Sequence, residues 1–467
     1  MKIQNPNDKI QINHSNQKSK YLRFGIGILF VICYLSFVIS LDGCAPAKKA
    51  GEENVVELWV MPNSLNPVGD IEALLKPFEE KTGIKVRVTS VDWGAGWSKI
   101  TTAATSGDVP DLAQLGSTWV SAIAAMGALE KISKEAVASL GGAKAFVPVA
   151  WQTTGIEGSG VVSAIPWFVD ARALFYRTDA FEKAGVTGKD LETWASFQSA
   201  LKKLYDADLV FDGQPMAPLG IAGKNDWNVI HSLAPWIWMA GGDFLSADRK
   251  TCVLDSEQAA AGISYYMNLV KEGYVPTEYL ELNTAQVSAN YNSGVVAMYF
   301  DGPYEVKTLT RPASEGGAGG SPAAKNFSVA GYPKGPKGRF TFVGGSMLGV
   351  FKQGKNKKAA FEVIKYLTSK TPQIEYAKVS GFLPARREAF NDPYFAADPN
   401  RKLFKDAVYY GRTYPAIPAW GLLEPILTRR LGILWDYVAA GQDFKPETIK
   451  EQLKLAKKEV EAILNQK

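Results

Sequence analysis

The stretch IPWFVDARALFY, residues 165–176, is the segment that says most about the fold of this chain. Almost every side chain in it is large and apolar, which predicts a strand buried on both faces. Asp170 and Arg172 interrupt the apolar run, and ionised groups in such surroundings are costly unless they are paired or used. Either the two residues neutralise each other, or one of them receives a polar ligand.

The segments before this stretch alternate between strand and helix patterns. VVELWV (55–60) is a β-branched strand, IEALLKPFEEKTG (71–83) has a helical apolar face, and IKVRVTS (84–90) alternates like a half-buried strand. This βαβ order predicts an α/β fold. Because 467 residues exceed what one hydrophobic core normally organises, we expect two domains or lobes.

The later segments continue the alternation. We expect a helix at 97–106, an alternating strand at 111–116, a helix after an N-cap at Thr193, and a helix that ends at Gly273. Residues 445–464 predict an amphipathic last helix. EGGAGGSPA (315–323) predicts a flexible loop rather than a phosphate-binding loop, because no Lys-Ser/Thr pair follows its glycines.

The first part of the chain has the pattern of an export signal. FGIGILFVICYLSFVISL (24–41) is uncharged, follows Lys18, Lys20 and Arg23, and is also just long enough for an uncleaved membrane anchor. LDGC (41–44) resembles a bacterial lipobox, although Asp42 departs from the usual small neutral residue. The resemblance implies a signal peptide at 1–43, a lipid on Cys44, a tether at 44–54, and a location on the outer face of the cytoplasmic membrane.

Cysteine content and charge limit the function classes. Of three cysteines, only Cys252 lies beyond the signal and its end, so the folded part should contain no internal disulfide. Removing residues 1–43 takes away five Lys/Arg and two Asp/Glu, which lowers the net charge from +5 to +2. This balance gives no reason to expect nucleic acid binding. No motif predicts a cofactor or a metal site.

Several segments, taken together, resemble a known family along nearly the whole exported chain. They are KTGIKVRV (81–88), the region TAATSGDVPDLAQLGSTWVSAIAAMGALE (102–130), the stretch at 165 with its following helix, TWASFQSALKKL (193–204), YNSGVVAMYFDGPYEV (291–306), and FTFVGGSMLGVFKQ with its continuation to Phe390. The chain is similar to the family 1 extracellular solute-binding proteins, the sugar receptors of ATP-binding-cassette importers that include the maltodextrin-binding type.

The resemblance implies two α/β lobes, each a mostly parallel sheet flanked by helices, joined by a hinge of two or three crossing strands. We place the first lobe at 55–168 and 346–388, and the second at 169–345 and 389–467. The adjacent glycines in VGGSMLGV (343–350) suit a return crossing, where the backbone must turn or a ligand approaches closely. The ligand is expected in the cleft between the lobes.

The candidate binding residues follow from these positions. Asp170 falls where the family's crossing strand carries an acidic residue, and a carboxylate accepts several hydroxyl hydrogen bonds. We favour a ligand contact for it, and less so for Arg172, because side chains two apart share a strand face but should diverge along it. Trp119 and Tyr304 stand at cleft positions of the family and would stack on sugar rings. The other candidates are Asp301, Thr118, Asn228, Trp236, Trp420, Gly345 and Ser346, with Trp93, Trp97 and Trp238 as weaker ones.

The function implied is a monomeric receptor that captures a mono- or oligosaccharide by hinge closure and delivers it to a membrane permease. Three alternatives remain open: a receptor that serves a sensor partner, a receptor for a non-sugar solute, and an extracellular carbohydrate-active enzyme. Hydrolysis would need two carboxyl groups at a fixed separation, for which only Asp170 and Asp301 come into question. His14 and His231 are the only histidines, and no nucleophile elbow or HExxH motif occurs. The sequence therefore predicts a binding protein rather than an enzyme.

Overall fold

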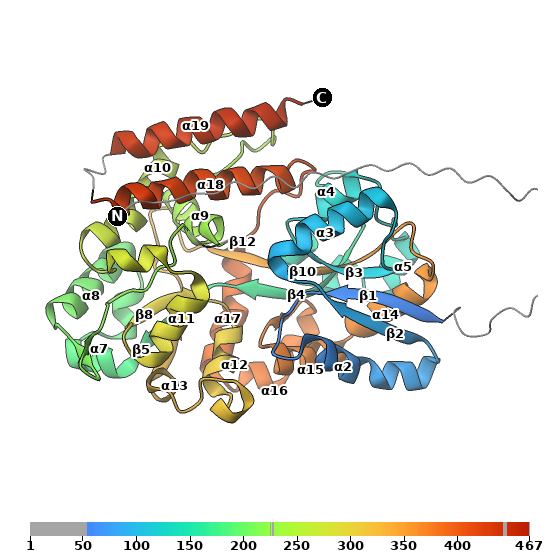
Figure 1. Cartoon of the computed structure of the whole chain (residues 1–467), viewed down its shortest axis with the longest axis horizontal. Coiled ribbons are helices and arrows are strands. Elements are labelled where there is room, and N and C mark those ends of the chain that lie inside the picture. Colours follow the sequence, from blue (N-terminus) through green and yellow to red (C-terminus); the bar gives the residue numbers. More distant parts are fainter. Residues whose placement is uncertain (1–53, 225, 227, 442–445, 467) are drawn as a thin grey trace, which may run out of the picture. The chain divides into compact units, whose positions relative to one another are not determined.

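The apolar stretch at 165 runs from one sheet into another. In the computed structural model, which describes residues 54–224, 226, 228–441 and 446–466, it forms β4 (Ile165–Ala171) and β5 (Ala173–Arg177), with Arg172 between them. β4 lies between β10 (Thr341–Val350) and β11 (Leu383–Pro384), whereas β5 lies between β8 (Met298–Asp301) and β9 (Phe327–Ala330). One continuous segment therefore connects two sheets, as predicted (Figure 1).

The sheet that contains β4 has seven strands among the described residues, in the order β11-β4-β10-β3-β1-β2 with β12 beside β10. The remaining strands are β1 (Val55–Val60), β2 (Lys85–Ser90), β3 (Leu112–Gly116) and β12 (Gly411–Arg412). β1 pairs in parallel with β2 and β3, but β10 is antiparallel to β3 and β4. The sheet is therefore mixed.

The second sheet differs from the prediction of a mostly parallel sheet. β5 pairs antiparallel with both β8 and β9. Parallel pairing occurs beside it only as isolated bridges among the described residues, at Ala217 and Gly220. The prediction fails because β5 enters this sheet directly from β4, so its direction is set by the crossing and not by a helical connection. A further hairpin joins β6 (Val210–Phe211) and β7 (Gln214–Pro215).

Helices cover both faces of the seven-stranded sheet. Figure 1 shows α3 and α4 on one side of it and α2, α14 and α15 on the other. The helices are α2 (Pro67–Thr82), α3 (Trp93–Ser106), α4 (Val120–Ala125), α5 (Lys134–Ser139), α6 (Pro148–Trp151), α7 (Thr178–Ala184), α8 (Trp194–Asp206), α9 (Val229–Ala240), α10 (Glu257–Lys271), α11 (Thr284–Ser293), α12 (Tyr304–Thr310), α13 (Pro322–Lys325), α14 (Lys357–Leu367), α15 (Lys370–Ser380), α16 (Pro393–Ala396), α17 (Pro399–Tyr410), α18 (Trp420–Ala439) and α19 (Pro446–Leu464). Short 3-10 turns lie at Ala143–Ala145, Gly188–Leu191, Thr277–Glu281, Ala313–Glu315 and Arg387–Asn391.

The local signals in the sequence explain most of these boundaries. α8 begins after Thr193, whose hydroxyl accepts a hydrogen bond from the Ser196 amide at 3.2 Å. α2 ends at Gly83, which has a left-handed φ of 72°. The predicted helix at 97–106 begins earlier, at Trp93, because Asp92 caps it through the amides of two following residues. β3 is buried at every position rather than alternating, since helices cover both of its faces.

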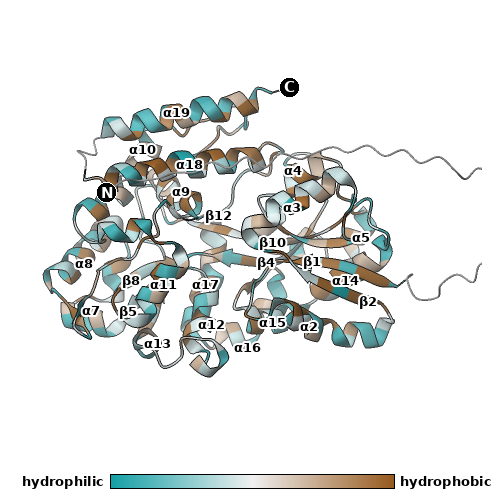
Figure 2. Ribbon diagram, in the orientation of Figure 1, coloured by the Kyte–Doolittle hydropathy of each residue, from teal (hydrophilic) through white to brown (hydrophobic). Residues whose placement is uncertain are grey.

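Two large apolar cores hold the fold. One is centred on α9, α10, α18 and α19, and the other lies around the seven-stranded sheet and reaches β5 and β8. Figure 2 shows hydrophobic and hydrophilic segments alternating along α19, and Ile449, Leu453 and Val460 are buried. The amphipathic last helix is thus confirmed, although Leu464 is only partly buried.

The described residues group as a single compact unit, and the predicted lobe boundaries stay a prediction. The predicted signal, Cys44 and all but the last residue of the tether lie outside the described residues. Within the part of the chain that the structure describes, no helix is both long and apolar enough to span a membrane. Cys252 is buried with a free thiol.

Candidate functional site

The site is built on the two crossing strands. In the antiparallel pairing of β4 and β10, Asp170 lies opposite Gly344, and Val169 lies opposite Gly345. A Cβ atom on Gly345 would lie 2.3 Å from the carbonyl oxygen of Phe168, and its φ is 137°. Only glycine fits this backbone, as the sequence predicted. The close approach of the two strands fixes where the Asp170 carboxylate stands.

Asp170 is paired on one side only. Its Oδ2 lies 3.2 Å from Nη2 of Arg172, and its side chain is 13% exposed. Its other oxygen, Oδ1, is buried and has no hydrogen-bond partner among the described residues. Burial raises the pKa of Asp170 to about 6, with the Asp301 carboxylate adding to the shift and Arg172 opposing it. A buried acceptor without a donor is what a ligand hydroxyl would complete.

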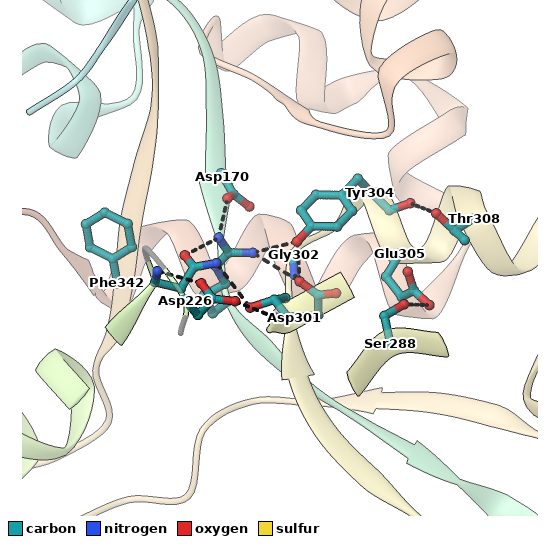
Figure 3. Close-up of polar contacts among 12 residues, drawn as sticks. Asp170, Asp226, Ser288, Asp301, Gly302, Tyr304, Glu305, Thr308 and Phe342 are labelled. Carbon is teal, nitrogen blue, oxygen red and sulfur yellow. Dashed lines mark hydrogen bonds and ion pairs between the residues drawn. The ribbon is translucent and has the colours of Figure 1, made fainter. Parts of the chain in front are cut away.

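The expectation that Asp170 and Arg172 diverge is wrong. Arg172 lies in the break between β4 and β5, and its long side chain returns toward the crossing strand. Its guanidinium donates to Asp301 Oδ1 at 3.1 Å, to the Tyr304 hydroxyl at 3.0 Å and to Asn228 Oδ1 at 3.3 Å. Burial acts against its charge, but Asp170, Tyr304 and Asp301 raise its pKa above the ordinary value. Arg172 therefore organises the site from within, and Figure 3 shows its partners Asp170, Asp301 and Tyr304.

Asp301 is closed off by its neighbours. It is 1% exposed and accepts hydrogen bonds from Arg172, from the Gly302 amide at 2.8 Å and from the Tyr304 hydroxyl. Burial raises its pKa, although each of these donors works in the other direction. In this structure Asp301 Oδ1 holds Arg172 and Tyr304 in place, and a ligand contact of Asp301 stays a prediction.

Tyr304 begins α12 and keeps part of its surface exposed. Its ring lies 5.4 Å from that of Phe382, which follows α15. A Cβ atom on Gly302 would lie 2.4 Å from the Tyr304 ring and 2.7 Å from Asp170 Oδ1, so the ring and the unpartnered oxygen face the same glycine. The structure therefore brings Asp170 and Tyr304 together. The small cavity beside Arg172, Asn228 and Asp301 measures only about 30 Å³.

Trp119 belongs to a group of three tryptophans. Its ring lies 5.7 Å from that of Trp93 and 5.9 Å from that of Trp97, both on α3, and all three are partly exposed. Gly96 and Gly116 make room for the ring, since a Cβ atom on either would lie within 3.2 Å of it. Trp97 in turn lies against Gly421 at the start of α18. The three rings thus form an aromatic group next to a helix that comes from the far end of the chain.

Glu424 on α18 is a residue that the sequence analysis missed. The Trp420 indole donates to its Oε2 at 2.9 Å, Thr118 also forms a hydrogen bond with it, and His231 Nε2 lies 3.8 Å from its Oε1. The side chain is 20% exposed, and burial raises its pKa to about 7 despite both hydrogen bonds. One signal could have revealed it: Glu424 is the only acidic residue in the apolar first half of that helix, four residues after Trp420.

His231 lies on α9 between two aromatic rings. Its Nδ1 is 2.8 Å from the Tyr414 hydroxyl, and its ring stacks on Phe342 at 4.2 Å. Burial, with a contribution from the Arg172 charge, lowers the pKa of His231 to about 3. His231 is therefore neutral at ordinary pH and packed between the two rings.

Comparison with known proteins places the chain in a family. Residues 73–403, well over half of the chain, match the family of bacterial extracellular solute-binding proteins. This chain belongs to that family. A relative is the diacetylchitobiose binding protein DasA of Streptomyces coelicolor, 26% identical over 85% of this chain and 90% of that protein. Another is a maltooligosaccharide ABC transporter solute-binding lipoprotein of Streptococcus pneumoniae, 22% identical over 91% of this chain and 95% of that protein.

Solved structures show the same two-lobed fold. The GacH receptor of Streptomyces glaucescens, solved without ligand and with acarbose, has a TM-score of 0.71 at 23% identity and covers 87% of this chain and 98% of that one. An ABC transporter solute binding protein of Thermotoga lettingae bound to alpha-D-tagatose has a TM-score of 0.72 at 23% identity and covers 88% and 100%. The α/β two-lobed fold of this solute-binding protein is thereby confirmed.

Three further candidates of the sequence analysis lie where they cannot contact a ligand in this structure. Trp236 is 0% exposed and stacks on Tyr266 at 4.8 Å, inside the core of α9 and α10. Trp420 is equally buried, with its ring stacked on Tyr414 at 4.6 Å. Ser346 is 0% exposed and its hydroxyl accepts from Gln114 Nε2 at 2.8 Å. Spacing reveals which face a residue occupies, but not what covers that face, so ligand contacts of these residues are not supported by this conformation and stay predictions.

The remaining candidates stay at the crossing. Gly345 serves the backbone there and accepts a hydrogen bond from the Ser117 amide at 3.0 Å. Thr118, which follows β3, forms a hydrogen bond with Glu424, and the buried Asn228 accepts a hydrogen bond from Arg172. Trp238 is 1% exposed beneath Arg412, whose guanidinium carbon lies 4.8 Å from its ring centre. Asp170, Tyr304, Trp119 and Thr118 therefore remain the candidate contacts for a solute, with Glu424 added by the structure.

Proposed function

We propose that this solute-binding protein is the carbohydrate receptor of an ATP-binding-cassette importer. The observation that carries the proposal is Asp170 Oδ1, a buried carboxylate oxygen without a hydrogen-bond partner on the crossing strand. A carboxylate in such a position accepts hydroxyl hydrogen bonds strongly. The Tyr304 ring beside it, and the three tryptophans around Trp119, offer the apolar faces that pyranose rings need.

The known relatives suggest which sugars to test first. One is named for diacetylchitobiose and another for maltooligosaccharides, so β-linked aminosugar disaccharides and α-linked glucose oligomers are the two primary ligand classes. Neither compound carries a charge, and Arg172 is already paired with two carboxylates of the site. We propose that the solute passes to a permease and is not chemically changed.

Capture requires the two lobes to move. The cavity beside the Arg172 network measures about 30 Å³, far below the roughly 300–1,000 Å³ of sites that hold small molecules. Entry of a sugar next to Asp170 therefore needs separation of α12 and α18 from α4, which Trp119 precedes. We propose hinge motion about β4 and β10, with closure around the sugar as the state that the permease receives.

A thermal-shift screen tests the proposal. The exported protein is melted alone and with diacetylchitobiose, maltose, maltotriose and a panel of monosaccharides, amino acids and polyamines. A sugar at a hundred times its dissociation constant should stabilise the fold by about 2.7 kcal/mol. Stabilisation by an amino acid or a polyamine and by no sugar would overturn the carbohydrate assignment. Product formation from the bound sugar, followed by chromatography, would overturn the proposal that the protein is a receptor and not an enzyme.

The location outside the cytoplasmic membrane rests on the LDGC segment and the apolar run before it. We propose that Cys44 carries a lipid and that the folded part is a monomer held at the membrane surface. Cys44→Ser should release the protein into the medium or periplasm, or leave the signal uncleaved. Membrane retention with the same mature N-terminus as the parent would contradict the lipid anchor.

A further inference from the structure

A second cavity lies away from Asp170. It has a volume of about 530 Å³ and lies between the segment 151–162, the end of α9 with the loop after it, and the segment from β12 to Ala416. Its size is that of a ligand pocket, so its lining decides what it can do. The polar and aromatic groups that matter are Glu157, Asp243, Arg249, Arg412, Trp238 and Tyr414.

The charged groups of this cavity are engaged with one another. Arg412 Nη2 lies 2.7 Å from Asp243 Oδ2, and Arg249 Nη2 lies 3.1 Å from Glu157 Oε1. Trp238 lies under the Arg412 guanidinium. The charges therefore balance in pairs, and the Arg412 guanidinium covers one face of the Trp238 ring. Each of these four charged groups would have to leave its partner before it could bind a ligand, so the charges of this lining do not by themselves recruit one.

The pair of Glu157 and Arg249 joins two segments that serve different parts of the site. Glu157 lies in the segment between α6 and β4, which leads into the strand of Asp170. Arg249 lies between α9, which carries His231, and α10. The Glu157 amide also donates to the carbonyl of Ala416 at 2.8 Å, just before α18 and Glu424. By our predicted boundaries these contacts connect the first lobe with the second.

Both ends of the ion pair are held in defined geometry. Arg249 donates from Nε to both carboxylate oxygens of Glu157, at 3.3 and 3.2 Å, and from Nη2 at 3.1 Å. Arg249 has a φ of 64°, which is uncommon for a residue other than glycine, and its amide donates to Ser246 at 2.9 Å. On the other side, Gly158 and Gly160 have φ values of 77° and 68°. Glycine adopts such values without strain, so among these three residues only Arg249 departs from its favoured backbone region, while its three hydrogen bonds define the geometry of the pair.

We infer that Glu157 and Arg249 are positioning residues for solute capture, whose ion pair holds the two predicted lobes together, both in the conformation seen here and in the state that closes around the sugar, against a more open one. The inference rests on the proposed hinge motion. A contact formed in one conformation and broken in another shifts their ratio by its own free energy, without touching the ligand. The pair is partly exposed, with side chains 42% and 33% accessible, so its effect should be no more than about fivefold in the ratio.

The first test uses the exported protein without any ligand. Glu157→Gln, Arg249→Gln and the double variant are compared with the parent by small-angle X-ray scattering. Each single variant should show a larger radius of gyration, and the double variant should show no more than either single one, because all three lack the same pair. In 0.5 M salt the parent should approach the variants, since exposed ion pairs are screened. Identical scattering of all four proteins would overturn the inference.

The second test measures affinity by calorimetry with maltotriose or diacetylchitobiose, whichever binds the parent. The variants should bind up to about fivefold more weakly with unchanged thermal stability in the absence of sugar. Glu130→Gln is the matched control: its ion pair with Lys357, at 3.1 Å and with similar exposure, joins two elements of the predicted first lobe, so affinity should not change. Equal effects of Glu130→Gln and Glu157→Gln would overturn the inference. If the parent binds no sugar, the proposed ligand fails, while the scattering test still decides the role of the pair.

Discussion

Asp170 shows how one residue can have both of the roles that its position suggested. One carboxylate oxygen pairs with Arg172, and the other is buried without a partner. Arg172 in turn is held by Asp301, Tyr304 and Asn228, so the position of Asp170 is fixed before any ligand arrives. Such preorganisation lowers the entropy that binding costs. The ion pair and the proposed ligand contact are thus compatible.

Asp170→Asn should weaken sugar binding by about ten- to a hundredfold. Loss of a charged hydrogen-bonding partner costs about 1.5–3 kcal/mol, and asparagine keeps the shape and one acceptor. Calorimetry with the sugar found in the thermal-shift screen measures the effect. Asp255→Asn, which removes a partly buried carboxylate paired with Lys457 at 3.1 Å far from the crossing strands, should leave affinity unchanged. Parent-like affinity of a folded Asp170→Asn would make the residue a partner of Arg172 only.

Glu305 gives a prediction about pH. It is 2% exposed, its Oε1 accepts from the Ser288 hydroxyl at 3.2 Å, and burial raises its pKa from 4.5 to about 8, with Asp301 adding to the shift (Figure 3). The folded state therefore keeps this proton to higher pH than the unfolded chain does. Stability should be lost as pH rises from about 4.5 to about 8, because the unfolded state gains by ionising.

Glu305→Gln cannot ionise and should show a shallower loss of stability across this range. Urea denaturation at pH 5, 6.5 and 8 measures it, with each unit of pKa shift worth about 1.4 kcal/mol. Asp170 and Glu424, whose pKa values are also raised, keep some of the slope in the variant. The exposed Glu130→Gln serves as the control and should follow the parent. A slope in Glu305→Gln as steep as that of the parent would contradict the assignment.

At the scale of the elements, β10 is the strand on which both the sheet and the crossing depend. It pairs with β3 and β4 along its length and with β12 at its start, and its register shifts between Ser346 and Met347. Gly345 lies directly before this irregularity, with its left-handed φ. The irregularity bends the strand, so that one end of β10 pairs within the seven-stranded sheet and the other end lies at the crossing.

Gly345→Ala should destabilise the protein by at least about 1 kcal/mol, since an added Cβ atom would meet the Phe168 carbonyl and the φ of 137° is unfavourable for alanine. Urea denaturation measures the change in free energy of unfolding. Gly432→Ala is the control, because this glycine lies within α18 with its nearest neighbour 3.7 Å from the added atom. That substitution should be neutral or stabilising by about 0.5–1 kcal/mol. Equal stability of the two variants would show that β10 tolerates a side chain at the crossing.

At the scale of the whole molecule, the segments next to α18 and α12 are tied to α4 and α15. Ser121 on α4 donates from its hydroxyl to the carbonyl of Ile417 at 2.8 Å, and Arg311 Nη2 donates to Val379 at 3.2 Å. These contacts join segments more than sixty residues apart in the sequence. By the predicted boundaries, both contacts join the first lobe to the second.

Saturating sugar should therefore shift the molecule toward one closed state. Small-angle X-ray scattering of the exported protein should give a radius of gyration at saturation no larger than without sugar, and smaller if the unliganded molecule opens in solution. The Glu157 variants should start from larger values and approach the parent once sugar is added. A larger radius of gyration with bound sugar than without it would contradict hinge closure.

The sequence by itself determined the elements, the crossing and the family, because each depends on signals that are local or recur along the chain. The doubly buried character of β4, the caps at Thr193 and Gly83, and the need for glycine at 345 can all be predicted from neighbouring residues. Only the tertiary structure decided the pairing of Asp170 with Arg172, the burial of Trp236 and Ser346, and the arrival of Glu424 beside Thr118. Periodicity assigns a side chain to a face of its element. What that face meets depends on how segments hundreds of residues apart pack, and burial and charge pairing are properties of that packing.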